Sequence, residues 1–97
     1  MENSDIAIKM TEALVKAGGT DKSVKFDFGD DGQIFASGTE ATTENNEADC
    51  TISLSKEDFV SLAEGNLDPM MAFMSGKLKV AGDMSVAMGL QTIFSNM

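Results

Sequence analysis

Five short segments in the second half of the chain decide the fold: ADCTISLS (48–55), KEDFVSLAEG (56–65), NLDPMMAFMSG (66–76), KLKVAG (77–82) and DMSVAMGLQ (83–91). The first alternates apolar and polar residues, which is the period of a strand with one buried face. The next two carry apolar residues at helical spacing and end in glycine. A second alternating strand and a final apolar helix follow. The order predicted is strand, helix, helix, strand, helix.

The starts of these helices carry capping signals. Ser55 stands three residues before Asp58, which is a capping-box pattern. Asp68 precedes Pro69, and proline is favoured at the first helical position because its missing N–H is not needed there. Asp83 is expected to cap the last helix.

The first half of the chain predicts a helix followed by a hairpin. Asn3 or Ser4 is expected to cap the helix, and the Gly18-Gly19 pair to end it. Residues 23–28 alternate as a strand, and the glycine-flanked turn at 29–32 should return the chain into a second strand over roughly 33–37. Residues 38–47 carry no large apolar side chain and are predicted to form an exposed connection, with an edge strand as an option.

The composition of the chain limits the functions that it could have. The chain has 97 residues, which is the size of one domain, and 16 acids against 7 lysines give a net charge of −9. Nucleic acid is a poor partner for such a chain, because phosphate binding needs a clustered basic surface. A single cysteine, an acidic N-terminus and no long apolar run predict a cytoplasmic protein without a signal peptide or a membrane span.

Catalysis and metal binding lack the residues that they need. Histidine is absent, so Cys–His and Ser–His–Asp arrangements are excluded, and no enzymatic activity is expected. Cys50 lies on the apolar face of a predicted strand and is interpreted as a small buried residue. The acids around the turn at 29–32 lack calcium-loop spacing, so neither a metal nor a cofactor is expected.

Methionine is concentrated in the last third of the chain. Six of the eight methionines are Met70, Met71, Met74, Met84, Met88 and Met97. Methionine at helical spacing is typical of a core, yet it also recurs where a surface must adapt to varied apolar partners. In the final helix the polar stripe (Ser85, Gly89, Thr92 and Asn96) is narrow, so we expect the helix to be covered on several sides. These residues alone leave an adaptable core and a ligand wall as alternatives.

The run from Ala48 to Gln91 resembles the sterol carrier protein family, also called the nonspecific lipid-transfer domain. The resemblance rests on the Cys-Thr-Ile strand, the Phe-xx-Leu helix, the Ala-Phe-xx-Gly-Lys-Leu-Lys-Val-x-Gly segment and Met-xxx-Met-x-Leu. It implies one domain over residues 1–97 with an α+β fold, in which helices cover a mixed, mainly antiparallel sheet of about five strands and enclose an apolar cavity or tunnel. It also implies a carrier of fatty acids, fatty acyl-CoA, sterols or phospholipids, with no catalytic residue and at most transient membrane contact.

The predicted lipid-binding residues are the apolar side chains of the second half of the chain: Phe59, Leu62, Met70, Phe73, Met74, Leu78, Val80, Met84, Met88, Leu90, Ile93 and Phe94. The alternative function is a non-catalytic interaction module, in which the methionine-rich C-terminal helix packs on a partner or on a second copy to form a homodimer.

Overall fold

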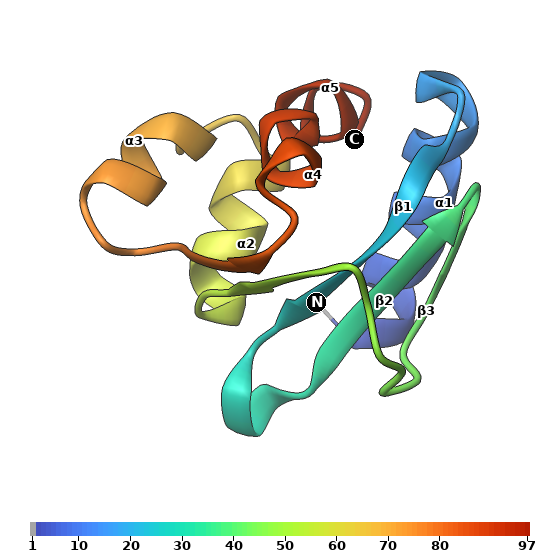
Figure 1. Cartoon of the computed structure of the whole chain (residues 1–97), viewed down its shortest axis with the longest axis horizontal. Coiled ribbons are helices and arrows are strands. Elements are labelled where there is room, and N and C mark those ends of the chain that lie inside the picture. The colour runs from blue at the N-terminus through green and yellow to red at the C-terminus, as the bar shows by residue number, and fades with distance from the viewer. Residues whose placement is uncertain (1) are drawn as a thin grey trace.

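A computed structural model describes residues 2–97, with only the backbone described for Leu90. The chain forms a five-stranded sheet with helices (Figure 1). Its elements are α1 (Asn3–Ala17), β1 (Thr20–Asp27), the 3₁₀ turn η1 (Gly29–Asp31), β2 (Gln33–Gly38), β3 (Glu40–Thr42), β4 (Cys50–Ser53), α2 (Lys56–Ala63), α3 (Pro69–Met74), β5 (Lys79–Gly82), α4 (Met84–Met88) and α5 (Leu90–Ser95).

The sheet has the strand order β3-β2-β1-β4-β5. β1 and β4 run parallel, with Val24 opposite Cys50 and Phe26 opposite Ile52. The other three pairings are antiparallel. The predicted mixed, mainly antiparallel sheet is therefore confirmed, and the predicted exposed connection includes the short edge strand β3.

One face of the sheet carries the hydrophobic core. Phe26 is fully buried in β1, and its ring lies against the rings of Phe59 on α2 and Phe94 on α5. α1 buries Ile6, Met10 and Leu14 in the same core. The alternation seen in the sequence is thus the alternation between this covered face and the opposite one.

The opposite face is crossed by the connection between β3 and β4, which passes in front of β2 and β1 in Figure 1. Lys25 Nζ donates a hydrogen bond of 3.0 Å to Asn45 Oδ1, and Gln33 Nε2 donates one of 2.7 Å to the carbonyl of Thr43. These two hydrogen bonds join β1 and β2 to the connection.

Three predicted helix caps are confirmed and one is wrong. The side chains of Ser55, Asp68 and Asp83 accept hydrogen bonds from backbone N–H groups at the starts of α2, α3 and α4. α1 instead has Glu2 at its N-cap without a side-chain hydrogen bond. Asn3 is not the cap because it is the first residue of the helix; its Nδ2 donates a hydrogen bond of 2.7 Å to the carbonyl of Asp31, which ties the helix start to the hairpin turn.

The last helix is divided, whereas the sequence pattern predicts one continuous helix. α4 ends at Met88, and α5 begins at Leu90 after a turn at Gly89. Glycine is among the weakest helix formers, so little intrinsic helix propensity opposes a break at this residue. Over residues 2–97, no helix combines the length and apolar character that crossing a bilayer requires.

Candidate functional site

Four phenylalanine rings form the apolar centre on which the helices meet. The ring of Phe59 lies 5.1 Å from that of Phe26, 5.2 Å from that of Phe28 and 5.4 Å from that of Phe94, between centroids. Edge-on and tilted arrangements at these separations are favourable for aromatic pairs. Phe94 therefore anchors α5 over the middle of the sheet.

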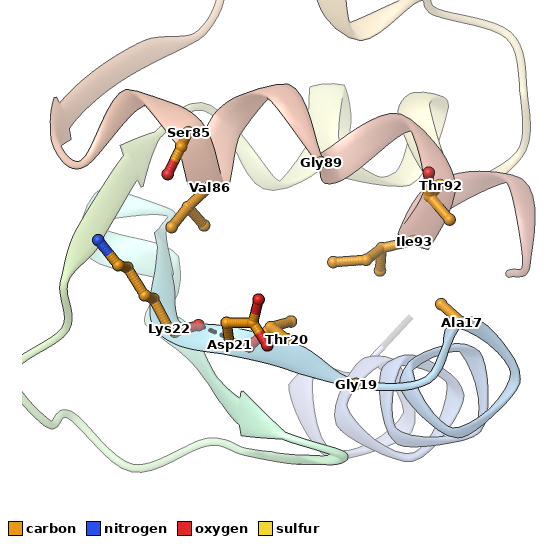
Figure 2. A pocket seen from close by; sticks show the side chains of 10 residues that line it. All are labelled: Ala17, Gly19, Thr20, Asp21, Lys22, Ser85, Val86, Gly89, Thr92 and Ile93. Carbon is orange, nitrogen blue, oxygen red and sulfur yellow. Dashed lines mark hydrogen bonds between the residues drawn. The ribbon is translucent and has the colours of Figure 1, made fainter.

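A cleft of about 270 Å³ separates α4 and α5 from the start of β1. Figure 2 shows Val86 and Ile93 projecting from the two helices toward this strand. The opposite wall comes from the end of α1 and the first residues of β1: Ala17, Gly19, Thr20, Asp21 and Lys22. Both walls of the cleft therefore mix apolar and polar residues, with Val86 and Ile93 as the large apolar side chains from α4 and α5.

Two more hollows lie near the C-terminal end of the chain. One, of about 490 Å³, lies between α1 and α2 and includes Ile6, Phe59 and Met97. The other, of about 410 Å³, lies beside the connection between α2 and α3 and includes Leu62, Leu67 and Phe94. Helix α5 therefore lies on the aromatic centre with open space on two of its sides, and the hollow between α1 and α2 reaches only Met97, beyond the end of α5. All three hollows are open to the surface, and the predicted enclosed cavity is not confirmed.

The predicted lipid-binding residues fall into two groups. Those in the core are Phe59, Leu62, Leu78, Ile93 and Phe94, and Val80 packs against them partly buried. Those on the surface are Met70, Phe73, Met74, Met84 and Met88. The side chain of Leu90 lies outside the described part of the chain. The structure therefore brings six of these residues together and leaves five facing outward.

The orientation of α4 corrects the expectation that the final helix is covered on several sides. Met84 and Met88 are 49% and 81% exposed. Ser85 and Gly89 from the polar stripe, with Thr92 on α5, line the cleft instead (Figure 2). The physical reason is that Ile93 and Phe94 anchor the helix pair in the core, which turns the methionine side of α4 toward solvent.

An ion pair joins the two sides of the cleft at one end. Lys22 on β1 contacts Asp83, the residue that caps α4. Asp83 Oδ1 also accepts hydrogen bonds from the Ser85 backbone N–H at 2.9 Å and from Ser85 Oγ at 2.6 Å. The hydrogen bond from Lys22, followed by those from Ser85, lowers the pKa of the Asp83 carboxyl to about 2. The pKa of Lys22 is raised by the same contact.

Sequence reasoning missed the wall that α1 and β1 contribute. Lys22 and Asp83 are 61 residues apart in the chain, and neither belongs to a motif that would connect them. The local signal that did exist, an aspartate before a helix, identified Asp83 as a cap only. Long-range pairing of this kind depends on strand order, which local periodicity does not report.

The pH response of this ion pair is directly testable. A carboxyl whose pKa is lowered on folding stabilises the fold above its unfolded pKa, near 3.9, and loses that contribution as the pH falls toward about 2. We expect Lys22→Gln to raise the pKa of Asp83 toward its ordinary value, measured by NMR titration of the carboxyl carbon. Lys25→Gln is the control, because Lys25 bonds to Asn45. An unchanged Asp83 pKa in Lys22→Gln would assign the depression to Ser85 alone.

Chemically, the site offers apolar surface rather than reactive groups. Burial raises the pKa of the Cys50 thiol, so the sulfur is protonated at neutral pH and packs as a small apolar group. No cluster of three or more acidic, cysteine or histidine side chains suited to a metal ion occurs within residues 2–97. The arrangement fits an apolar ligand held by burial.

Comparison with known proteins identifies the family of the chain and agrees with its fold. The sequence model of the SCP-2 sterol transfer family matches residues 5–95, so the chain belongs to that family. Among curated proteins it is 45% identical over 53 residues to hydroxysteroid dehydrogenase-like protein 2 of Bos taurus, a match covering 55% of this chain and 13% of that protein. It is 45% identical over 49 residues to human sterol carrier protein 2, covering 50% and 9%.

A solved relative shows the same fold over the whole chain. The NMR structure of sterol carrier protein-2 from Aedes aegypti, in complex with the C16 fatty acid palmitate, superimposes with a TM-score of 0.80. The match covers 100% of this chain and 97% of that one at 13% identity, so it establishes the fold alone. The predicted fold class and family resemblance are confirmed, while the curated matches span only a small part of each relative.

Proposed function

We propose that this chain is a non-catalytic lipid carrier that holds an acyl chain between the sheet, α2 and the α4–α5 pair. The observation that carries the proposal is that α5 packs Phe94 into the cluster formed with Phe26, Phe28 and Phe59, with open space on two sides of the helix. The wall is assigned to the buried or half-buried predicted residues, which are Phe59, Leu62, Leu78, Val80, Ile93 and Phe94. Fatty acids, fatty acyl-CoA, sterols and phospholipids all present the apolar surface that this wall can cover.

Energetics suit exchange with membranes. Burial of an acyl chain gains about 0.8 kcal/mol per methylene relative to water. Most of this gain is already present in a bilayer, so transfer between bilayer and protein is nearly balanced. A small movement of α5 about Gly89, the residue between α4 and α5, would enlarge the space beside α5 for the acyl chain.

Palmitate is the first ligand to test. A ligand that binds only the folded state raises its melting temperature by mass action. We expect palmitate to raise the melting temperature, and native mass spectrometry to find one lipid per chain in freshly purified protein. Absence of both effects with palmitate, palmitoyl-CoA and a sterol contradicts the proposal. Apo dimers would favour the alternative of an interaction module.

A variant locates the ligand. Val86→Phe enlarges a half-buried side chain that projects into the cleft below α4. Overpacking costs about 1–3 kcal/mol, so we expect palmitate affinity to fall roughly tenfold. Val15→Phe is the matched control, because Val15 is exposed on α1 away from the cleft. Equal palmitate affinity in the two variants would place the ligand elsewhere.

A further inference from the structure

Helix α3 is apolar nearly all round, yet the structure covers only one of its side chains. Ala72 is fully buried, whereas Met70, Met71 and Met74 are 60%, 63% and 77% exposed. Phe73 is 44% exposed. A helix with apolar residues on every side normally lies buried in protein or lipid. We call Met70, Met71, Phe73 and Met74 the α3 surface.

Charge around this surface differs from that of the rest of the chain. The charged residues between positions 69 and 82 are Lys77 and Lys79, both exposed, and the acid at the start of α3 is its N-cap Asp68, whose Oδ1 accepts hydrogen bonds from the N–H groups of Met70 and Met71. The next acid along the chain is Asp83, which is already paired with Lys22. Thirteen of the 16 acids precede residue 59. In Figure 1, α3 lies on the side of the molecule remote from β2 and β3.

We infer that the α3 surface docks on the interface of a lipid bilayer, an inference that rests on the proposed carrier function. Methionine and phenylalanine side chains would enter the boundary between headgroups and acyl chains, as an interfacial helix does. Lys77 and Lys79 would contact lipid phosphates. Anionic headgroups would repel the acids in the rest of the chain, so the molecule would approach the bilayer with α3 facing it. The four residues of the α3 surface and the two lysines provide little contact area, so binding to the bilayer is reversible.

Charge also distinguishes a bilayer from a second copy of the chain. A two-fold dimer places the same patch on both subunits. Two α3 surfaces brought together would collect Lys77 and Lys79 of both copies in or beside one interface, which concentrates like charge there. Lipid phosphates neutralise these cations instead, so the bilayer is the occupant that matches the surface.

A fluorescent reporter tests the orientation. The chain contains no tryptophan and no tyrosine, so Met71→Trp introduces a single reporter on α3. We expect its emission to shift to the blue, and to be quenched by brominated lipids, on addition of phosphatidylcholine vesicles containing a minority of phosphatidylglycerol. Val15→Trp, at an equally exposed position of α1, should show neither change. The same shift in both variants overturns the proposal.

Charge variants test the energetics in vesicle flotation. Met71→Asp is expected to lower vesicle binding at least about tenfold, because a charge is costly in the apolar boundary layer. Ile8→Asp is the matched control, since Ile8 is 59% exposed on α1 and should leave binding unchanged. Each of Lys77→Gln and Lys79→Gln should lower binding about fivefold. Circular dichroism confirms that each variant is folded.

Palmitate binding is measured on the same samples and separates the two proposals. Retained palmitate binding in Met71→Asp with lost flotation supports the docking surface. Palmitate binding without flotation of the unmodified chain overturns the docking surface alone. Flotation without palmitate binding supports the surface and overturns the carrier. Dimerisation through α3, detected by light scattering and abolished by Met71→Asp while vesicles stay unbound, also overturns the docking surface.

Discussion

Phe59→Ala is expected to lower the free energy of unfolding by about 3–5 kcal/mol, the range for truncating a buried aromatic residue. Phe59 is fully buried on α2, and its ring contacts those of Phe26, Phe28 and Phe94. Truncation removes all three ring contacts and leaves a cavity that rigid strand neighbours cannot close. Because small domains have only about 5–15 kcal/mol of stability, much of the total is at stake. Urea unfolding followed by circular dichroism measures the change.

The same substitution on α3 provides the control. Phe73 is 44% exposed and belongs to none of the four aromatic pairs. We expect Phe73→Ala to change the free energy of unfolding by about 1 kcal/mol or less, as at other poorly buried sites. A comparable loss in the two variants would show that α3 is covered in solution, and would remove the basis of the α3 surface.

Local chemistry predicted most of the fold. The alternation in 23–28 and 48–55, the glycine-flanked hairpin turn and the caps at Ser55, Asp68 and Asp83 each depend on a few adjacent residues. Such signals stay valid whatever surrounds them. Asn3 is not the cap because the helix begins one residue earlier than predicted, and its Nδ2 donates instead to the carbonyl of Asp31, 28 residues away, a contact that local patterns do not report.

The site was harder to predict because it depends on how α4 and α5 are turned. Periodicity identifies a wide apolar arc on the last helix, but not which part of that arc meets the sheet. Phe94 occupies the core because its ring packs edge-on against the rings of Phe26 and Phe59. Met88, only six residues earlier, is then left 81% exposed. Tertiary contacts decide which side of the last helix faces the core, and no local sequence pattern predicts that orientation.

This outcome changes what the methionines can do. The sequence left an adaptable core and a ligand wall as alternatives, and the structure places Met70, Met74 and Met88 in neither position. Exposed side chains that are flexible and polarisable fit a surface that meets variable apolar partners. The proposed ligand wall then consists of phenylalanine, leucine, valine and isoleucine, and the exposed methionines remain predicted lipid contacts on the outside of the molecule.

Gly82→Ala is expected to lower the free energy of unfolding by about 3 kcal/mol or more, because it combines backbone strain with a steric clash. Gly82 has φ of 100°, a conformation that residues with a side chain rarely adopt. A Cβ atom there would lie 2.4 Å from the carbonyl oxygen of Asp49 and 3.2 Å from the Cα atom of Cys50. Both neighbours are backbone atoms of the adjacent segment, so no side-chain rotation relieves the contact.

The damage should reach the site as well as the sheet. Gly82 pairs with Cys50 where β5 meets β4, and the next residue, Asp83, donates its N–H to the carbonyl of Asp49 at 3.0 Å. Moving β5 therefore displaces the residue that caps α4 and pairs with Lys22. In the variant we expect the pKa of Asp83 to rise from about 2, measured by NMR titration of its carboxyl carbon.

Gly89→Ala should raise the free energy of unfolding, whereas Gly82→Ala should lower it. The opposite direction makes Gly89→Ala a stringent control. Gly89 lies between α4 and α5 with φ of −83°, and a Cβ atom there would meet only the carbonyl oxygen of Val86, at an ordinary 3.5 Å. Alanine favours a helix by up to about 1 kcal/mol over glycine, so urea unfolding should show a gain. If α5 must move about Gly89 to admit a ligand, the same change should slow palmitate uptake. Loss of stability in both variants would mean that glycine is required at the α4–α5 turn too.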